Sequence, residues 1–120
     1  MPVRSLSSSV LRWPDGAAVH KAAALWAAEQ GRCRREILRI GYFGSYARGD
    51  WGVGSDLDIV MIVERSALPF EQRPLAYAVP HLPVPVDLLI YTAEEWAALA
   101  ASPNHFHRAL EAKSIWLYNR

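Results

Sequence analysis

The chain has 120 residues, a length that predicts one folded domain with little left for a second. Hydrophobic residues make up 52% and charged residues 21%, which is enough apolar material for a core and excludes an intrinsically disordered chain. Thirteen Lys and Arg stand against twelve Asp and Glu, so a net charge of +1 gives no general attraction to nucleic acid or to an anionic membrane.

The sequence also argues against secretion and membrane insertion. Its single cysteine, Cys33, excludes an internal disulfide and a cysteine-based zinc site, and favours a reducing compartment. The longest strongly apolar run, residues 57–63, is far shorter than the roughly 20 residues that cross a bilayer. Residues 1–10 lack the apolar block of a signal peptide. We therefore expect a cytoplasmic protein without membrane contact.

In chain order, residues 1–16 predict an N-terminal arm or edge strand that ends in a Pro-Asp-Gly turn. Apolar residues at helical spacing predict an amphipathic helix over residues 17–30, which Gly31 would end. The arginines that follow, between Arg32 and Arg35, are interpreted as a solvated turn in preference to a nucleic-acid patch.

Two strands are expected in the middle of the chain. Residues 37–43 predict a strand that ends at Gly44, with a short helix opening at Ser45 and a glycine-rich loop over residues 49–54. Residues 57–63 are apolar and rich in β-branched side chains, which predicts a strand that is buried on both faces.

The second half of the chain alternates helices and strands. Prolines weaken a helix predicted within residues 66–79, and a strand follows at residues 86–91. The capping box Thr92-Ala93-Glu94-Glu95 opens a helix to Ala101, and Ser102-Pro103 predicts a further helix through Glu111. Residues 115–118 complete the pattern as a short strand. The sequence predicts a single α/β (α+β) domain with a small mixed sheet flanked by helices.

The most informative acids lie at the start of the second strand. Asp56 and Asp58 are two residues apart, so strand geometry places both side chains on one face with their roots roughly 6.6 Å apart. Two unit charges at that distance repel by roughly 2–3 kcal/mol at an effective dielectric of 20. Such a pair is expected to share a cation, and Mg²⁺ suits carboxylate oxygens and substrate phosphates.

A third acid, Asp87, lies in the next apolar strand and can reach the same cation if the two strands pair. The structural alternative is that Asp56 caps a turn, Asp58 meets an arginine and Asp87 marks the start of a strand. That alternative suits any one of the acids better than it suits all three together.

Gly44 and Ser45 are interpreted as a phosphate-binding turn. A glycine at the end of a strand allows the backbone to approach a phosphate closely, and the N–H groups that begin the next helix point toward the anion. Arg48 is interpreted either as a phosphate or partner ligand, or as the partner of Asp50 or Glu64 in an ion pair. Trp51 is expected to be a half-buried aromatic residue in preference to a base-stacking one.

These residues together resemble a known family. Gly-Ser at 44–45, ten intervening residues, Asp-x-Asp at 56–58 and one more acid on a later strand resemble the DNA polymerase β-type nucleotidyltransferase superfamily. The fuller segments Gly-Ser-Tyr-Ala-Arg-Gly and Ser-Asp-Leu-Asp-Ile are similar to the minimal nucleotidyltransferases, small proteins that often act as antitoxins to HEPN-domain toxins.

The resemblance implies a polymerase β-like fold over residues 1–120 and a transfer of AMP from ATP. It implies that Asp56, Asp58 and Asp87 hold two Mg²⁺ ions, that Asp87 helps to deprotonate the acceptor, and that Gly44 and Ser45 hold the outer phosphates. The implied acceptor is a protein hydroxyl, commonly a tyrosine of the HEPN partner, which becomes AMP-modified and inactive.

Two other functions stay open at this point. The chain could be a binding antitoxin or adaptor that blocks its partner by contact alone. It could also be a small-molecule nucleotidyltransferase, although such enzymes carry a further substrate domain. Direct binding of nucleic acid is not expected, and an oligomer of identical chains or with the toxin is compatible with the sequence.

Overall fold

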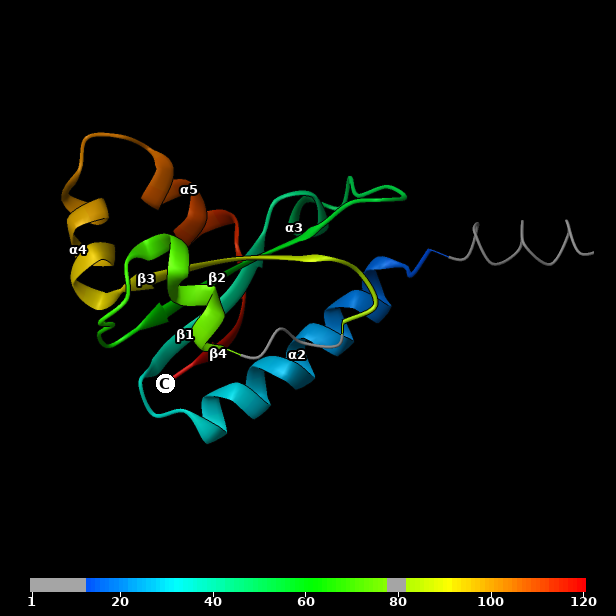
Figure 1. The fold of residues 1–120 in the computed structure, drawn as a ribbon. Helices are drawn as coiled ribbons and strands as arrows, with labels where there is room; N and C mark the ends of the chain where they lie inside the picture. The colour runs from blue at the N-terminus through cyan, green and yellow to red at the C-terminus, as the bar shows by residue number, and fades with distance from the viewer. Residues whose placement is uncertain (1–12, 78–81) are drawn as a thin grey trace, which may run out of the picture.

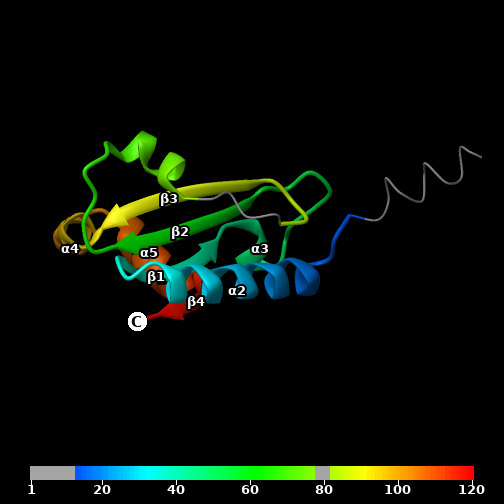
Figure 2. The same cartoon turned by 60° about the horizontal axis from the view of Figure 1, so that its bottom comes forward.

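The computed structural model describes residues 13–77 and 82–120, so residues 1–12 of the expected arm lie outside it. Its four strands form one mixed sheet in the order β3-β2-β1-β4, with helices on both faces (Figures 1 and 2). The strands are β1 (Ile37–Phe43), β2 (Leu57–Val63), β3 (Val86–Thr92) and β4 (Ile115–Asn119). The helices are α2 (Gly16–Cys33), α3 (Ser45–Arg48), η1 (Phe70–Ala76, a 3₁₀ helix), α4 (Ala93–Ala101) and α5 (Phe106–Lys113). This architecture confirms the expected α/β class.

Strand β2 lies inside the sheet and is buried on both faces, as its apolar sequence predicts. It pairs antiparallel with β1 and parallel with β3. The odd-numbered residues of β2 join the main core with Val19, Ala23 and Ala27 of α2. Because side chains alternate along a strand, the even-numbered residues, Asp58 among them, face the opposite side, where α4 and α5 lie.

Helix α2 packs along the first of these faces, and its end differs from the prediction. Asp15 caps the helix by accepting a hydrogen bond from the Ala18 N–H at 2.8 Å. The helix continues through Gly31 to Cys33. Gly31 is buried against the ring of Tyr118, and any side chain at this position would overlap that ring. The glycine therefore permits close packing of α2 on β4, and the expectation that it ends the helix was wrong.

Two other helix predictions need correction. In the described part of the helix predicted over residues 66–79, which ends at residue 77, the chain forms the 3₁₀ helix η1 and no α-helix, because Pro69 and Pro74 deprive a regular α-helix of backbone donors. The last two residues of that prediction lie outside the described residues. Residues 102–105 form bends, and α5 begins at Phe106, not at Pro103. There the Asn104 side-chain oxygen accepts a hydrogen bond from the Phe106 N–H at 3.1 Å.

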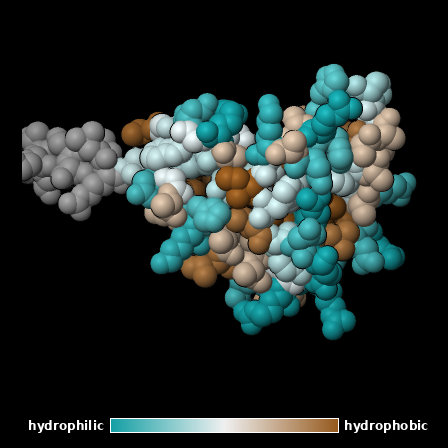
Figure 3. Space-filling view, turned by 180° about the vertical axis from the view of Figure 1, so that it is seen from behind, coloured by the Kyte–Doolittle hydropathy of each residue, from teal (hydrophilic) through white to brown (hydrophobic). Residues whose placement is uncertain are grey.

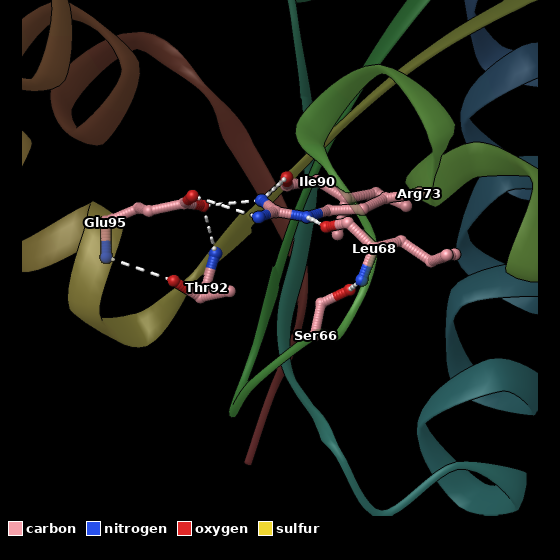
Figure 4. Close-up of polar contacts among 6 residues, drawn as sticks. All are labelled: Ser66, Leu68, Arg73, Ile90, Thr92 and Glu95. Atoms are coloured by element: carbon pink, nitrogen blue, oxygen red, sulfur yellow. Dashed lines mark hydrogen bonds and ion pairs between the residues drawn. The ribbon is translucent and has the colours of Figure 1, made fainter.

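A buried ion pair fastens η1 and α4 to the end of β3 (Figure 4). The Arg73 side chain, only 7% exposed, donates to both carboxylate oxygens of Glu95 and to the carbonyls of Leu68 and Ile90. Glu95 also accepts the backbone N–H of Thr92, whose hydroxyl accepts the Glu95 N–H, so the predicted capping box is confirmed. Through these bonds one arginine connects three successive elements.

The surface is mixed in character. Figure 3, which views the molecule from behind, shows mostly hydrophilic and intermediate residues with hydrophobic ones in separate small patches. The large hydrophobic side chains that the structure leaves most exposed are Leu25, Val53, Leu75 and Phe106. Within residues 13–77 and 82–120, no helix has the length and apolar character needed to cross a membrane.

The Arg73–Glu95 pair predicts a measurable loss of stability in Glu95→Gln. Arg73 would stay buried without its charged partner, so we expect the free energy of unfolding to fall by about 1–2 kcal/mol, a modest value because Glu95 is partly exposed. Urea denaturation measures this change. Glu94→Gln, on the exposed side of the same helix turn, is the matched control and should change stability little.

The same variant has a predicted pH dependence. The hydrogen bonds from Arg73 hold the pKa of Glu95 below its ordinary value. The stabilisation is therefore complete above the ordinary carboxyl pKa and is lost as the pH falls through the lowered folded-state value. The difference between wild type and Glu95→Gln should shrink in acid. A difference that is unchanged down to the acid transition would contradict this role for the pair.

Candidate active site

The site begins at the end of β1, where the chain turns sharply at Gly44. This residue has φ 76° and ψ −150°, a backbone conformation that is accessible essentially only to glycine. A Cβ atom here would overlap the carboxylate of Asp58, which lies directly beside it because Phe43 pairs with Asp58 across β1 and β2. Glycine is thus needed both for the turn and for the close approach of the backbone to the acid.

The single-turn helix α3 and the following loop then bring the chain back to β2. Helix α3 starts at Ser45, as predicted, and ends at Arg48. Gly49 caps it with φ 86° and donates its N–H to the Ser45 carbonyl. A second turn forms where Gly52 and Ser55 exchange hydrogen bonds, with Gly54 at φ 89°. This turn places Asp56 immediately before β2.

All three acids that the sequence singles out lie on the face of the sheet that α5 covers. Asp56 and Asp58 have the same parity on β2, and both line one cavity. Asp87 is the direct partner of Asp58 in the parallel register of β2 and β3, and directly paired residues of neighbouring strands project to the same side. Val86 and Leu88, which flank Asp87, pack against the main core on the opposite face.

The carboxylates of these acids are not paired with a cationic side chain in the described part of the chain. Within residues 13–77 and 82–120, no side-chain hydrogen bond or ion pair involves the carboxylate of Asp56, Asp58 or Asp87. The alternative in which Asp58 meets an arginine is thus not what is observed, because Arg48 pairs with Asp50 at 3.1 Å.

The electrostatic consequence is clearest at Asp58. Burial raises the pKa of the Asp58 carboxyl, and the negative charges of Asp87 and Asp56 raise it further, while Arg48 opposes the shift. Like charges raise the pKa of an acid because they disfavour its ionised form. The proximity of the acids follows from the geometry, since Asp87 is the register partner of Asp58 and Asp56 lines the same cavity as Asp58.

A cavity of about 630 Å³ opens over this face, a volume in the range of small-ligand sites. Its walls come from the Gly44 turn, α3, the start of β2 and one side of α5. The lining residues are Phe43, Gly44, Ser45, Ala47, Arg48, Ser55, Asp56, Asp58, Phe106, Ala109, Leu110 and Lys113. Gly44, Ser45 and Arg48, which the sequence proposes as phosphate ligands, therefore share one cavity with two of the three acids.

Asp87 lies beside this cavity and does not line it. It is exposed on β3, at the edge of the sheet, while its register partner Asp58 lines the cavity. The three acids are thus divided between the cavity and the open edge next to it.

Sequence reasoning missed the contribution of α5. Phe106, Leu110 and Lys113 lie at positions i, i+4 and i+7 of this helix and so share one stripe, which forms a wall of the cavity. The spacing is visible in the sequence. What the sequence could not supply is that the helix lies over Asp56 and Asp58 and not elsewhere on the sheet.

The donor set fits a hard cation that is completed by substrate. Among the described residues, no three His, Cys, Asp or Glu side chains gather into a preformed metal site. Mg²⁺ is ordinarily bound by one or two carboxylates together with water and substrate phosphates, so Asp56 and Asp58 in an open cavity are suitable ligands. Their mutual repulsion is the kind of strain that a bound cation removes.

Other side chains take structural roles. Trp51 stacks on Tyr46 with ring centroids 5.4 Å apart and is half-buried, as expected. His20 bonds the Tyr42 hydroxyl at 2.8 Å, and His107 packs on Trp96. His81 lies outside the described residues.

Comparison with known proteins decides the family. The model of the nucleotidyltransferase domain family matches residues 28–117, a span that holds β1, β2, β3, the start of β4, the Gly44 turn and all three acids. The chain belongs to this family. General nucleotidyl transfer is the chemistry of the nucleotidyltransferase domain, which agrees with a cavity that combines a glycine turn with carboxylates.

A solved structure has the same fold. It is the crystal structure of a "putative nucleotidyltransferase" from Sulfolobus solfataricus, which superimposes with a TM-score of 0.57 over 88% of this chain and 84% of that chain. The two sequences are 17% identical, so this similarity concerns the fold. No curated protein is significantly similar to this sequence.

The geometry at Gly44 predicts a selective effect of Gly44→Ala. The methyl group would both strain the backbone and displace Asp58, so we expect a loss of about 1–3 kcal/mol in unfolding free energy together with loss of nucleotide binding. Gly49→Ala is the matched control, since Gly49 also has positive φ but a Cβ there meets nothing within 4 Å. Calorimetric titration should show binding retained in Gly49→Ala. Equal binding by both variants would contradict the proposed contact.

The repulsion among the acids predicts that Asp58→Asn leaves the ligand-free protein as stable as wild type or more so, by up to about 1 kcal/mol. The raised pKa means that ionised Asp58 costs stability above its folded-state pKa, and that this cost disappears below the ordinary aspartate pKa. The advantage of the variant should therefore be present at neutral pH and absent in acid. Urea denaturation at both pH values measures it, and a less stable variant at neutral pH would identify Asp58 as a structural partner.

Proposed function

We propose that this nucleotidyltransferase domain transfers AMP from ATP to a hydroxyl group of a partner protein, with Mg²⁺ as the required ion. The observation that carries the proposal is that Asp56 and Asp58, whose carboxylates form no ion pair within the described residues, share a cavity with the Gly44-Ser45 turn. The two carboxylates favour a bound cation, and the turn offers hydrogen-bond donors to a phosphate group.

The chain's own residues divide the work of binding. Ser45 and the backbone after Gly44 receive the outer phosphates, since the strand-to-helix turn offers N–H donors and a hydroxyl to an anion. Arg48 lines the same cavity and adds positive charge, although it also pairs with Asp50. Asp56 and Asp58 would hold Mg²⁺, which offsets the charge of the phosphates and of the leaving group.

The transfer step itself needs an acceptor and a base. The acceptor oxygen forms a bond to the α-phosphorus, the bond from that phosphorus to the bridging oxygen breaks, and pyrophosphate leaves. The hydroxyl proton passes to the Asp87 carboxylate, which lies next to Asp58 in the register yet outside the nucleotide cavity. Its exposed position beside the cavity supports this role, because an acceptor could reach Asp87 without displacing the nucleotide.

The exposure of Asp87 favours an acceptor carried by another protein. The acid lies on an open edge of the sheet, where a side chain of a second molecule can reach it. From the resemblance of residues 44–49 and 55–59 to the minimal nucleotidyltransferases, we propose that the partner is a HEPN-domain toxin and that the acceptor is a tyrosine. In this proposal the chain acts as the antitoxin of the pair.

The experiment combines the protein with a HEPN partner, Mg²⁺ and ATP labelled at the α-phosphate. Wild type should label the partner, and Asp56→Asn with Asp58→Asn should reduce labelling by at least about a hundredfold, because the cation ligands are lost. Glu64→Gln, at the far end of β2, removes one acidic charge away from the cavity and should leave labelling unchanged.

The alternative of inhibition by contact alone makes a different prediction in the same experiment. If the double variant still neutralises the partner while label transfer is lost, the protein acts by binding. If wild type labels small hydroxyl compounds and no protein, the acceptor proposal is wrong while nucleotidyl transfer stands.

A further inference from the structure

We propose that α5 is the nucleotide-selecting wall of the cavity, with Lys113 binding the triphosphate and Phe106 stacking on the nucleobase. This inference rests on the proposed function and deepens it, because it assigns roles to two residues that the sequence motif does not contain. It starts from the cavity lining, in which one stripe of α5 stands opposite the Gly44 turn and the acids.

Helix α5 is held rigidly over the sheet. Arg39 of β1 donates to both carboxylate oxygens of Glu111, at 3.0 and 2.8 Å, and its guanidinium lies 3.7 Å from the ring centroid of Trp116. The Trp116 indole N–H in turn donates to the Glu111 carbonyl at 3.3 Å. A helix that is fixed in this way does not itself have to be ordered when a ligand binds, so only its ligand-contacting side chains lose freedom.

The register of the sheet places Lys113 at the phosphate end of the cavity. Ile115 of β4 pairs with Tyr42 of β1, so the end of α5 meets the end of β1, where Gly44 follows (Figure 1). Lys113 lines the cavity, and none of the ion pairs formed within the described residues includes it. An unpaired ammonium group beside a phosphate-binding turn is suited to a polyanion.

Phe106 lies at the other end of the same stripe. Seven residues separate it from Lys113, which is about 10 Å along the helix axis, so the two side chains would contact different parts of a nucleotide. Phe106 is 43% exposed although it is a large aromatic residue, and it lines the cavity with Leu110. An exposed aromatic ring at the apolar end of a ligand cavity is a stacking surface for a base.

The test separates the two ends of the ligand by calorimetric titration with ATP and with inorganic tripolyphosphate, both in Mg²⁺. Phe106→Ala should weaken ATP binding about tenfold and leave tripolyphosphate binding unchanged, because only ATP carries a base. Phe106→Trp should restore ATP binding. Lys113→Met should weaken both ligands about tenfold, and Lys113→Arg should recover most of the loss.

The chain offers a matched control for the charge change. Lys21→Met removes the other lysine of the sequence, which is exposed on α2 over the opposite face of the sheet, and it should alter neither titration. Urea denaturation of each variant verifies that folding is retained. If Phe106→Ala fails to fold, Phe106→Leu keeps the test decisive, because it retains an apolar side chain and removes the aromatic ring.

Each outcome has a defined meaning. The inference is overturned if Phe106→Ala weakens both ligands equally or neither, or if Lys113→Met behaves like Lys21→Met. If those variants bind normally while wild type still transfers AMP, the inference falls and the proposed function stands. If wild type binds neither ATP nor tripolyphosphate, both fall together.

Discussion

The central constraint of this molecule is the contact between the Gly44 backbone and the Asp58 carboxylate. It requires a glycine in a conformation that other residues avoid, and it keeps an acid close to two further acids without an ion pair to any of them among the described residues. If these acids served stability alone, each would be expected to have a partner of opposite charge or to be an uncharged residue, since mutual repulsion costs free energy. The surrounding elements are best understood as the frame that holds this contact in place.

That frame uses each strand for a different purpose. Strand β1 ends in the Gly44 turn, β2 carries Asp58 into the cavity, and β3 sets Asp87 beside it in register. Strand β4 returns from α5 and so fixes the far wall of the cavity. The Arg73–Glu95 pair secures the end of β3 from outside. The nucleotide side and the acceptor side of the site therefore come from different strands of one sheet.

Much of this arrangement could be predicted from the sequence. Strong local signals, such as the apolar run of β2 and the capping box before α4, predicted those two elements correctly. The Gly-Ser and Asp-x-Asp spacing pointed to residues that line the cavity. One error arose where tertiary packing overrides local preference, because Gly31 serves contact with Tyr118 and does not end α2. The other is local, because α5 starts three residues late, where the Asn104 side chain accepts the Phe106 N–H. The role of α5 could not be predicted, because a helix stripe does not reveal which residues it faces.

The most direct test of the central claim is the titration of the Asp58 carboxyl, followed by carbon-detected NMR. In the free protein its pKa should lie above the ordinary aspartate value, because burial and the charges of Asp87 and Asp56 disfavour ionisation. Addition of Mg²⁺ and ATP should lower it, since a bound cation favours the carboxylate. An ordinary pKa in the free protein that does not respond to Mg²⁺ and ATP would contradict the account.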